Sequence, residues 1–118
     1  MKRDDVWLKE KLENIWELLF PEVPRENNVH AKFKGKSLRR FGCIKRKGKD
    51  SLIEINSLFK NEIIPEHVVD VTLAHELVHY MHGFNSPLPR KYKHPHKGGI
   101  VDKELIKRGF GHSLKLEK

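Results

Sequence analysis

One segment near the middle of the chain constrains the fold most, because its helical pattern runs unbroken between two residues that typically bound helices. Pro65 stands where helices often begin, and Gly83 follows residues 66–82 as a typical helix end. This predicted helix carries the run His75-Glu76-Leu77-Val78-His79. A chain of 118 residues has room for one hydrophobic core, so we expect residues 1–118 to form a single domain that contains this helix.

Two further helices are predicted on either side of this segment. Residues 4–20 carry apolar side chains at helical spacing, and Pro21 supplies a stop. Residues 99–108 form a second, shorter helical pattern that ends at Gly109. Residues 110–118 then remain as a tail.

Strand patterns lie between the first helix and the central one. Residues 29–33 alternate between apolar and polar side chains, which is the period of a half-buried strand. The runs 39–46 and 51–56 flank Gly48 and predict a β-hairpin. Together these patterns predict an α+β fold. In this fold we expect a small β-sheet to pack on the N-terminal and central helices, and a short C-terminal helix to follow.

The spacing of His75 and His79 is that of a metal site. Residues four apart are neighbours on one face of a helix, so both imidazoles can reach one zinc ion at about 2.0 to 2.1 Å. Glu76 is offset from His75 by about 100° around the helix and can address a water on that ion. The motif therefore predicts two zinc ligands and a general base, Glu76.

A third ligand is needed, and the spacing leaves several possibilities. His82 lies seven residues beyond His75, about 10 Å along the helix axis, so it cannot converge on the same ion. We expect it instead to line or border the cleft. His94, His96 and Glu104 all follow a loop that is long enough for the chain to reverse, and geometry alone does not choose between them.

Charge and cysteine content limit the other possibilities. The formal charge of +8 favours acidic partners, nucleic acid among them, but the positive residues are spread over several segments, as on a solvated Lys-rich surface. No apolar run approaches the roughly 20 residues that cross a bilayer, and the first residues lack a secretory signal, so we expect a cytoplasmic protein without membrane contact. Cys43 is the only cysteine, which excludes an intramolecular disulfide and a Cys-rich zinc ribbon.

Four segments together resemble SprT-like metallopeptidases and the minimal archaeal metallopeptidases called minigluzincins. They are Arg40-Phe41-Gly42-Cys43, residues 52–56, the helix with His75 to His79, and Pro95-His96, and the match spans about residues 38–108. The resemblance implies a minimal zincin-like metallopeptidase fold with one Zn²⁺ per chain. It also implies hydrolysis of peptide bonds in a peptide or protein substrate.

The resemblance also bears on the third ligand. In these families the third zinc ligand is a histidine late in the chain. It lies just ahead of a helix, and the residue four positions after it is apolar. His96 fits because Ile100 occupies that place, whereas His94 would put Gly98 there. SprT-like proteins often have a glycine directly after the late histidine, but Lys97 follows here. Together with the missing zinc ribbon, this departure favours the minigluzincin-like side.

Two more expectations come from the resemblance. The strand at residues 51–57 is expected to be an edge strand that pairs with an extended peptide through main-chain hydrogen bonds. Minigluzincins are known as latent forms in which C-terminal residues obstruct the cleft, so residues 110–118 are expected to be inhibitory.

Two rival functions remain open on sequence alone. The chain could be a basic nucleic-acid-binding module with a structural or inactive zinc site, which would be expected to have four protein ligands. It could also be a metal-dependent ribonuclease with three histidines, which would not need Glu76. The sequence carries no signal for an oligomeric state.

Overall fold

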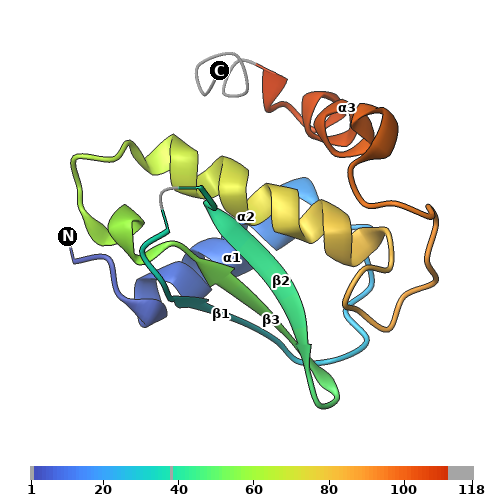
Figure 1. Cartoon of the computed structure of the whole chain (residues 1–118), viewed down its shortest axis with the longest axis horizontal. Helices are drawn as coiled ribbons and strands as arrows, with labels where there is room; N and C mark the ends of the chain where they lie inside the picture. The colour runs from blue at the N-terminus through green and yellow to red at the C-terminus, as the bar shows by residue number, and fades with distance from the viewer. Residues whose placement is uncertain (1, 38, 112–118) are drawn as a thin grey trace.

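The order of elements along the chain follows the predicted α+β pattern (Figure 1). The computed structural model describes residues 2–37 and 39–111. Its elements are α1 (Asp5–Leu19), β1 (Val29–Phe33), β2 (Gly42–Lys47), β3 (Asp50–Ile55), α2 (Glu66–Met81) and α3 (Ile100–Lys107). Two short 3-10 turns, Ser57–Lys60 and Lys97–Gly99, are additions that the sequence patterns do not predict.

The first helix forms where its cap and apolar stripe predict it. The Asp4 carboxylate accepts a hydrogen bond from the backbone N–H of Trp7 at 2.8 Å, which satisfies a donor that the first turn leaves free. The apolar stripe of α1 is buried, and its Trp16 donates its indole N–H to the Val23 carbonyl at 3.0 Å. Helix α1 therefore packs as an amphipathic element against the core.

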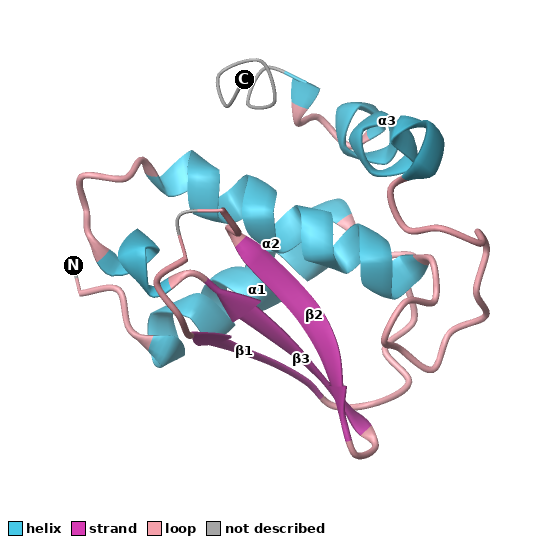
Figure 2. Ribbon diagram, in the orientation of Figure 1, coloured by secondary structure: helices cyan, strands magenta, loops and turns pink. Residues whose placement is uncertain are grey.

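The central helix α2 is buried on nearly all sides and supports the rest of the fold. Val69, Leu73 and Leu77 are almost fully buried. Helix α2 contacts β2 and β3, α1 and α3, while α1 covers β1. Figure 2 shows α3 on the side of α2 that faces away from the sheet. Any side chain of α2 that reaches a cleft is therefore held by a helix fixed from several directions.

The predicted hairpin is present, but its first strand begins later than expected. Strands β2 and β3 pair antiparallel, with Lys47 opposite Asp50 around a turn at Gly48. The prediction placed the start of the first strand at residue 39, whereas β2 starts at Gly42. The buried side chain of Asn56 donates to the carbonyls of Ser37 and Arg40, and these bonds hold the preceding segment out of the sheet.

The prediction that residues 51–57 form an edge strand is wrong. The strand order is β1-β3-β2, with β1 parallel to β3, so β3 is the central strand. After β1 the chain skips the neighbouring position in the sheet and forms β2, and β3 then fills the position between them. The alternation of apolar and polar residues within a strand does not reveal this order. The edge that lies beside α2 belongs to β2.

The turn after α2 requires a glycine, which yields a stability prediction. Gly83 has a φ of +86°, and a Cβ added there would lie 2.5 Å from the Pro89 carbonyl oxygen and 2.6 Å from the Arg90 Cα. We expect Gly83→Ala to lower the free energy of unfolding by about 3 kcal/mol, because backbone strain and a backbone clash combine. Urea denaturation of zinc-free protein measures this difference.

Gly48 provides the matched control for that substitution. It also has a positive φ, +63°, but nothing lies within 4 Å of an added Cβ. Gly48→Ala should therefore cost only the backbone strain, about 1 kcal/mol. Equal losses in the two variants would contradict the clash at Gly83.

Candidate metal centre

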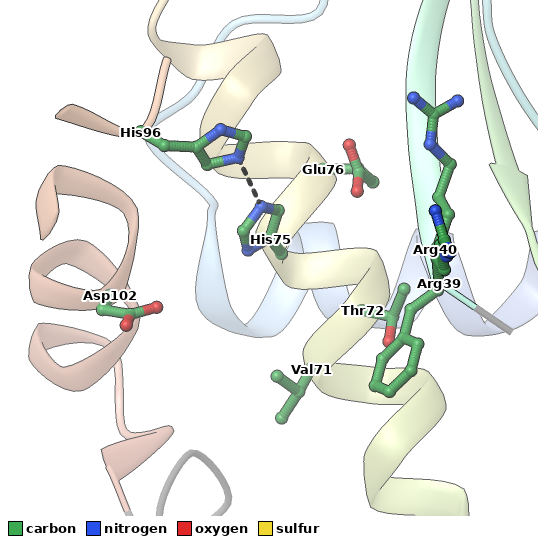
Figure 3. A pocket seen from close by; sticks show the side chains of 10 residues that line it. Arg39, Arg40, Val71, Thr72, His75, Glu76, His96 and Asp102 are labelled. Carbon is green, nitrogen blue, oxygen red and sulfur yellow. Dashed lines mark hydrogen bonds between the residues drawn. The ribbon is translucent and has the colours of Figure 1, made fainter. Parts of the chain in front are cut away.

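Three histidines from two parts of the chain converge on one point. His75 and His79 project from α2, and His96 comes from the loop that precedes α3. Figure 3 shows His75 and His96 facing each other. The Nε2 atom of His75 lies 3.2 Å from those of His79 and His96, and the last two are 2.9 Å apart. Each Nε2 carries at most one proton, and all three face one another. The three side chains could therefore hold one metal ion between them.

The residues present fit a zinc ion. Two zinc–nitrogen bonds of about 2.0 to 2.1 Å at a tetrahedral angle would separate the nitrogens by roughly 3.3 Å, which is close to the observed spacing. Burial lowers the pKa of His75 to about 4 and that of His79 to about 3. These imidazoles are therefore unprotonated at neutral pH, as ligands must be. Within residues 2–37 and 39–111, no other His, Cys, Asp or Glu joins this group.

The alternatives for the third position lie elsewhere. The Glu104 carboxylate accepts a hydrogen bond from the Arg108 Nε at 2.7 Å and is not a member of the histidine group. His94 is exposed and also lies outside the group. The structure thus brings together His96 with the two motif histidines, and places neither of the other two predicted alternatives there.

His82 differs from its predicted place at the border of the cleft. It is only 3% exposed, and its ring packs edge-on against Tyr92 with centroids 4.8 Å apart. It is not among the residues that line the two cavities beside the histidines. As the C-cap of α2 it turns toward the following loop, because a residue seven positions along the helix has moved away from the metal group.

The loop that carries His96 is anchored to the sheet at its start and leads into the buried face of α3 at its end. The Asn85 side chain donates to the Ile44 carbonyl at 3.0 Å, and the Ser51 hydroxyl donates to the Asn85 carbonyl at 2.7 Å. At the other end of the loop, Val101 and Leu105 of α3 are buried. His96 is therefore placed between two anchored ends rather than at the tip of a free loop.

Glu76 is buried beside the histidine group, on the side of α2 that faces β2. It is 4% exposed, and this burial raises its pKa to about 8, against the opposing effect of the Arg40 charge. Figure 3 shows its carboxylate directed between α2 and the segment that carries Arg40. A carboxyl group placed in this way can accept and return a proton.

Two cavities meet at these side chains. The larger, of about 400 Å³, extends along the N-terminal half of α2, and the smaller, of about 270 Å³, extends toward Phe84 and Asn85. Both are lined by His75, Glu76 and His96, so the histidine group lies between them.

Sequence reasoning missed two residues of this region. Asn85, with a φ of +52°, caps the backbone of β2, and no motif marks it apart from the tolerance of Asn for this conformation. Arg40 lines both cavities, but in the sequence it is only the first residue of the segment Arg40-Phe41-Gly42-Cys43, and no motif assigns it to a cavity. Its position becomes visible only once β2 is placed beside α2.

Comparison with protein-family models, with curated proteins and with solved structures finds no match for this chain. Among the described residues, no helix has both the length and the apolar character that crossing a membrane requires. The fold is a small α+β domain, and the functional argument rests on the side chains at its histidine group.

Proposed function

We propose that this protein is a zinc-dependent metallopeptidase of zincin-like type. In this proposal His75, His79 and His96 hold one zinc ion, and Glu76 is the general base. The observation that carries the proposal is the convergence of three Nε2 atoms beside one buried carboxylate. Peptide hydrolysis that disappears on chelation and returns with zinc is the experiment that tests it.

In the proposed reaction, the zinc ion and Glu76 have different roles. A zinc ion in such a site supplies Lewis acidity, which lowers the pKa of a bound water and polarises a carbonyl group. Glu76 takes the proton from the attacking water and gives it to the leaving amine. Burial of Glu76 supports this role, because it holds the carboxyl group beside the histidine group and largely away from bulk water.

The edge of β2 is the element best placed to hold an extended substrate. Asn56 donates its backbone N–H to the Phe41 carbonyl at 2.8 Å, so the main chain of Phe41 faces β3. Because strand residues alternate, the main-chain groups of Gly42 and Ile44 face away from β3. The Ile44 carbonyl already accepts a hydrogen bond from the Asn85 side chain. The part of the β2 edge that can pair with a substrate main chain therefore lies toward Gly42 and the larger cavity.

The rival functions receive less support from this arrangement. A structural zinc site is expected to fill all four positions with protein ligands, whereas the group contains three in the described part of the chain. A three-histidine ribonuclease would not need a buried carboxylate at position 76. A buried Glu76 beside the group therefore favours hydrolysis with a carboxylate base.

The C-terminal tail is expected to inhibit the enzyme, and its start moves from residue 110 to residue 112. Residues 112–118 lie outside the described residues, but Phe110 is 8% exposed and donates its N–H to the Leu105 carbonyl, so it belongs to the core. We expect removal of residues 112–118 to raise peptidase activity roughly tenfold, because a tethered segment can reach millimolar effective concentration at a cleft. Cleavage of an unstructured test protein measures the rate.

The control for latency replaces residues 112–118 by a Gly-Ser segment of equal length. This variant keeps the chain length but removes His112 and Glu117, whose side chains are able to compete for an open zinc position. It should match the truncated protein in rate. If full-length and truncated proteins of equal zinc content cleave at the same rate, the tail is not inhibitory.

A further inference from the structure

The larger of the two cavities has a wall of positive charge. It is lined by the consecutive residues Arg39 and Arg40, and both side chains are exposed. Neither guanidinium forms an ion pair with an Asp or Glu in the ranges 2–37 and 39–111. Arg25 and Arg108 differ, since Arg25 pairs with Glu13 and Arg108 with Glu22, whereas Arg3, Arg46 and Arg90 also form no ion pair among the described residues. Two adjacent cations that form no ion pair among the described residues therefore line a cavity that opens at the histidine group.

We propose that this cavity binds a carboxylate of the substrate, so that acidic peptides are the preferred substrate class. The inference deepens the proposed peptidase function and rests on it. The carboxylate can come from an Asp or Glu side chain or from the C-terminus of a peptide, and both present the same two oxygens to a guanidinium.

Of the two acidic residues that line the cavity, Asp102 lies on the opposite side from the arginines, and Glu76 lies between α2 and the segment that carries Arg40. Figure 3 shows Asp102 on α3, beyond His75 and His96, while Arg39 and Arg40 lie across the cavity near β2. The negative charge of Asp102 acts on His75. With a metal dication at the histidines, positive charge in the cavity outweighs Glu76 and Asp102. A carboxylate beside the arginines therefore meets a favourable field.

The main chain at Arg40 is held in place before any substrate arrives. Asn56 is 5% exposed, and its amide donates to the Arg40 carbonyl at 2.9 Å and to the Ser37 carbonyl. Its side-chain oxygen accepts the Leu58 N–H at 2.9 Å. Because this buried amide fixes the main chain, only the arginine side chains have to be ordered on binding, which reduces the entropic cost.

The remaining lining suits the aliphatic part of an acidic residue. Phe41, Val71 and Thr72 also line the cavity and contribute carbon atoms to its wall. A cavity of about 400 Å³ holds a side chain of the size of Glu with room for its main chain. The net charge of +8 also attracts acidic substrates from a distance.

Binding to an inactive, zinc-loaded protein tests the inference. In the Glu76→Gln background, fluorescence anisotropy compares labelled peptides of one length that differ only by Glu or Gln at positions along the chain. A second pair differs only by a C-terminal acid or amide. We expect one carboxylate form to bind roughly tenfold more tightly than its neutral partner, as a charge-assisted contact predicts. The pair that shows this difference identifies the source of the carboxylate.

Two double variants decide whether the arginines are responsible. Arg39→Gln/Arg40→Gln should reduce the carboxylate preference to less than twofold. Arg46→Gln/Lys47→Gln removes two charges from exposed positions of β2 that do not line the cavity, and should keep the preference. Circular dichroism and zinc content verify that both variants are folded and loaded.

The outcomes separate this inference from the proposed function. Equal affinity for acidic and neutral peptides, or a preference that survives Arg39→Gln/Arg40→Gln, overturns the carboxylate site. The same peptides are also offered to protein with Glu76 intact. A carboxylate preference without any hydrolysis supports the site and contradicts the peptidase, whereas hydrolysis without a carboxylate preference does the reverse.

Discussion

Glu76→Gln is expected to reduce peptide hydrolysis by about a hundredfold to ten-thousandfold while the zinc content stays at one ion per chain, because general acid–base catalysis contributes roughly 10² to 10⁴ in rate. The amide has nearly the same shape as the carboxylate but cannot accept the proton of the attacking water. Glu76 is also not a member of the histidine group, so its replacement leaves the ligands in place. Steady-state kinetics and elemental analysis on the same preparation measure both quantities.

Glu104→Gln is the matched control for this substitution. It makes the same chemical change on α3, where the carboxylate pairs with Arg108 rather than with the histidine group. It should retain zinc and most of the activity. Wild-type turnover by the Glu76→Gln protein would contradict the peptidase mechanism and favour the three-histidine ribonuclease, which does not need this residue.

His96→Ala is expected to weaken zinc binding by about three orders of magnitude or more, because two imidazoles from one helix make a poor site without the third ligand. The weaker zinc binding should also reduce the free energy of unfolding that zinc adds. A ligand at a thousand times its dissociation constant stabilises the folded state by about 4 kcal/mol, and His96→Ala should lose most of that zinc-dependent increment. Competition with a chromophoric chelator measures the affinity, and urea denaturation with and without zinc measures the increment.

His94→Ala is the control for the third ligand, because it removes an exposed imidazole from the same loop, two residues earlier. It should bind zinc as the wild type does. Full zinc retention in His96→Ala, together with loss in His94→Ala or Glu104→Gln, would move the third ligand to one of those residues.

The helices and strands could be predicted from the sequence because their signals are local. Asp4 caps α1, Gly83 follows the C-cap of α2, and alternating residues mark β1. The start of β2 was predicted too early, because it depends on a hydrogen bond from Asn56 to the Arg40 carbonyl across the sheet. A pattern within one strand carries no information about such a partner.

The order of the strands and the cavity wall are long-range properties, and the sequence did not reveal them. The parallel pairing of β1 with β3 makes β3 central, and it moves the expected peptide-binding edge to β2. This placement also brings Arg40 beside Glu76, which are 36 positions apart in the chain. In contrast, the spacing of His75 and His79 is local, so two members of the histidine group could be predicted from the helix alone.

Cleavage of peptide bonds by the purified protein is the measurement that tests the central claim most directly. Zinc-loaded protein ending at residue 111 is incubated with a mixture of unstructured peptides, and mass spectrometry identifies new termini. The account predicts new termini that vanish on chelation, return with zinc and are absent with Glu76→Gln. Folded, zinc-loaded protein that produces no Glu76-dependent termini, in both the full-length and shortened forms, would contradict it.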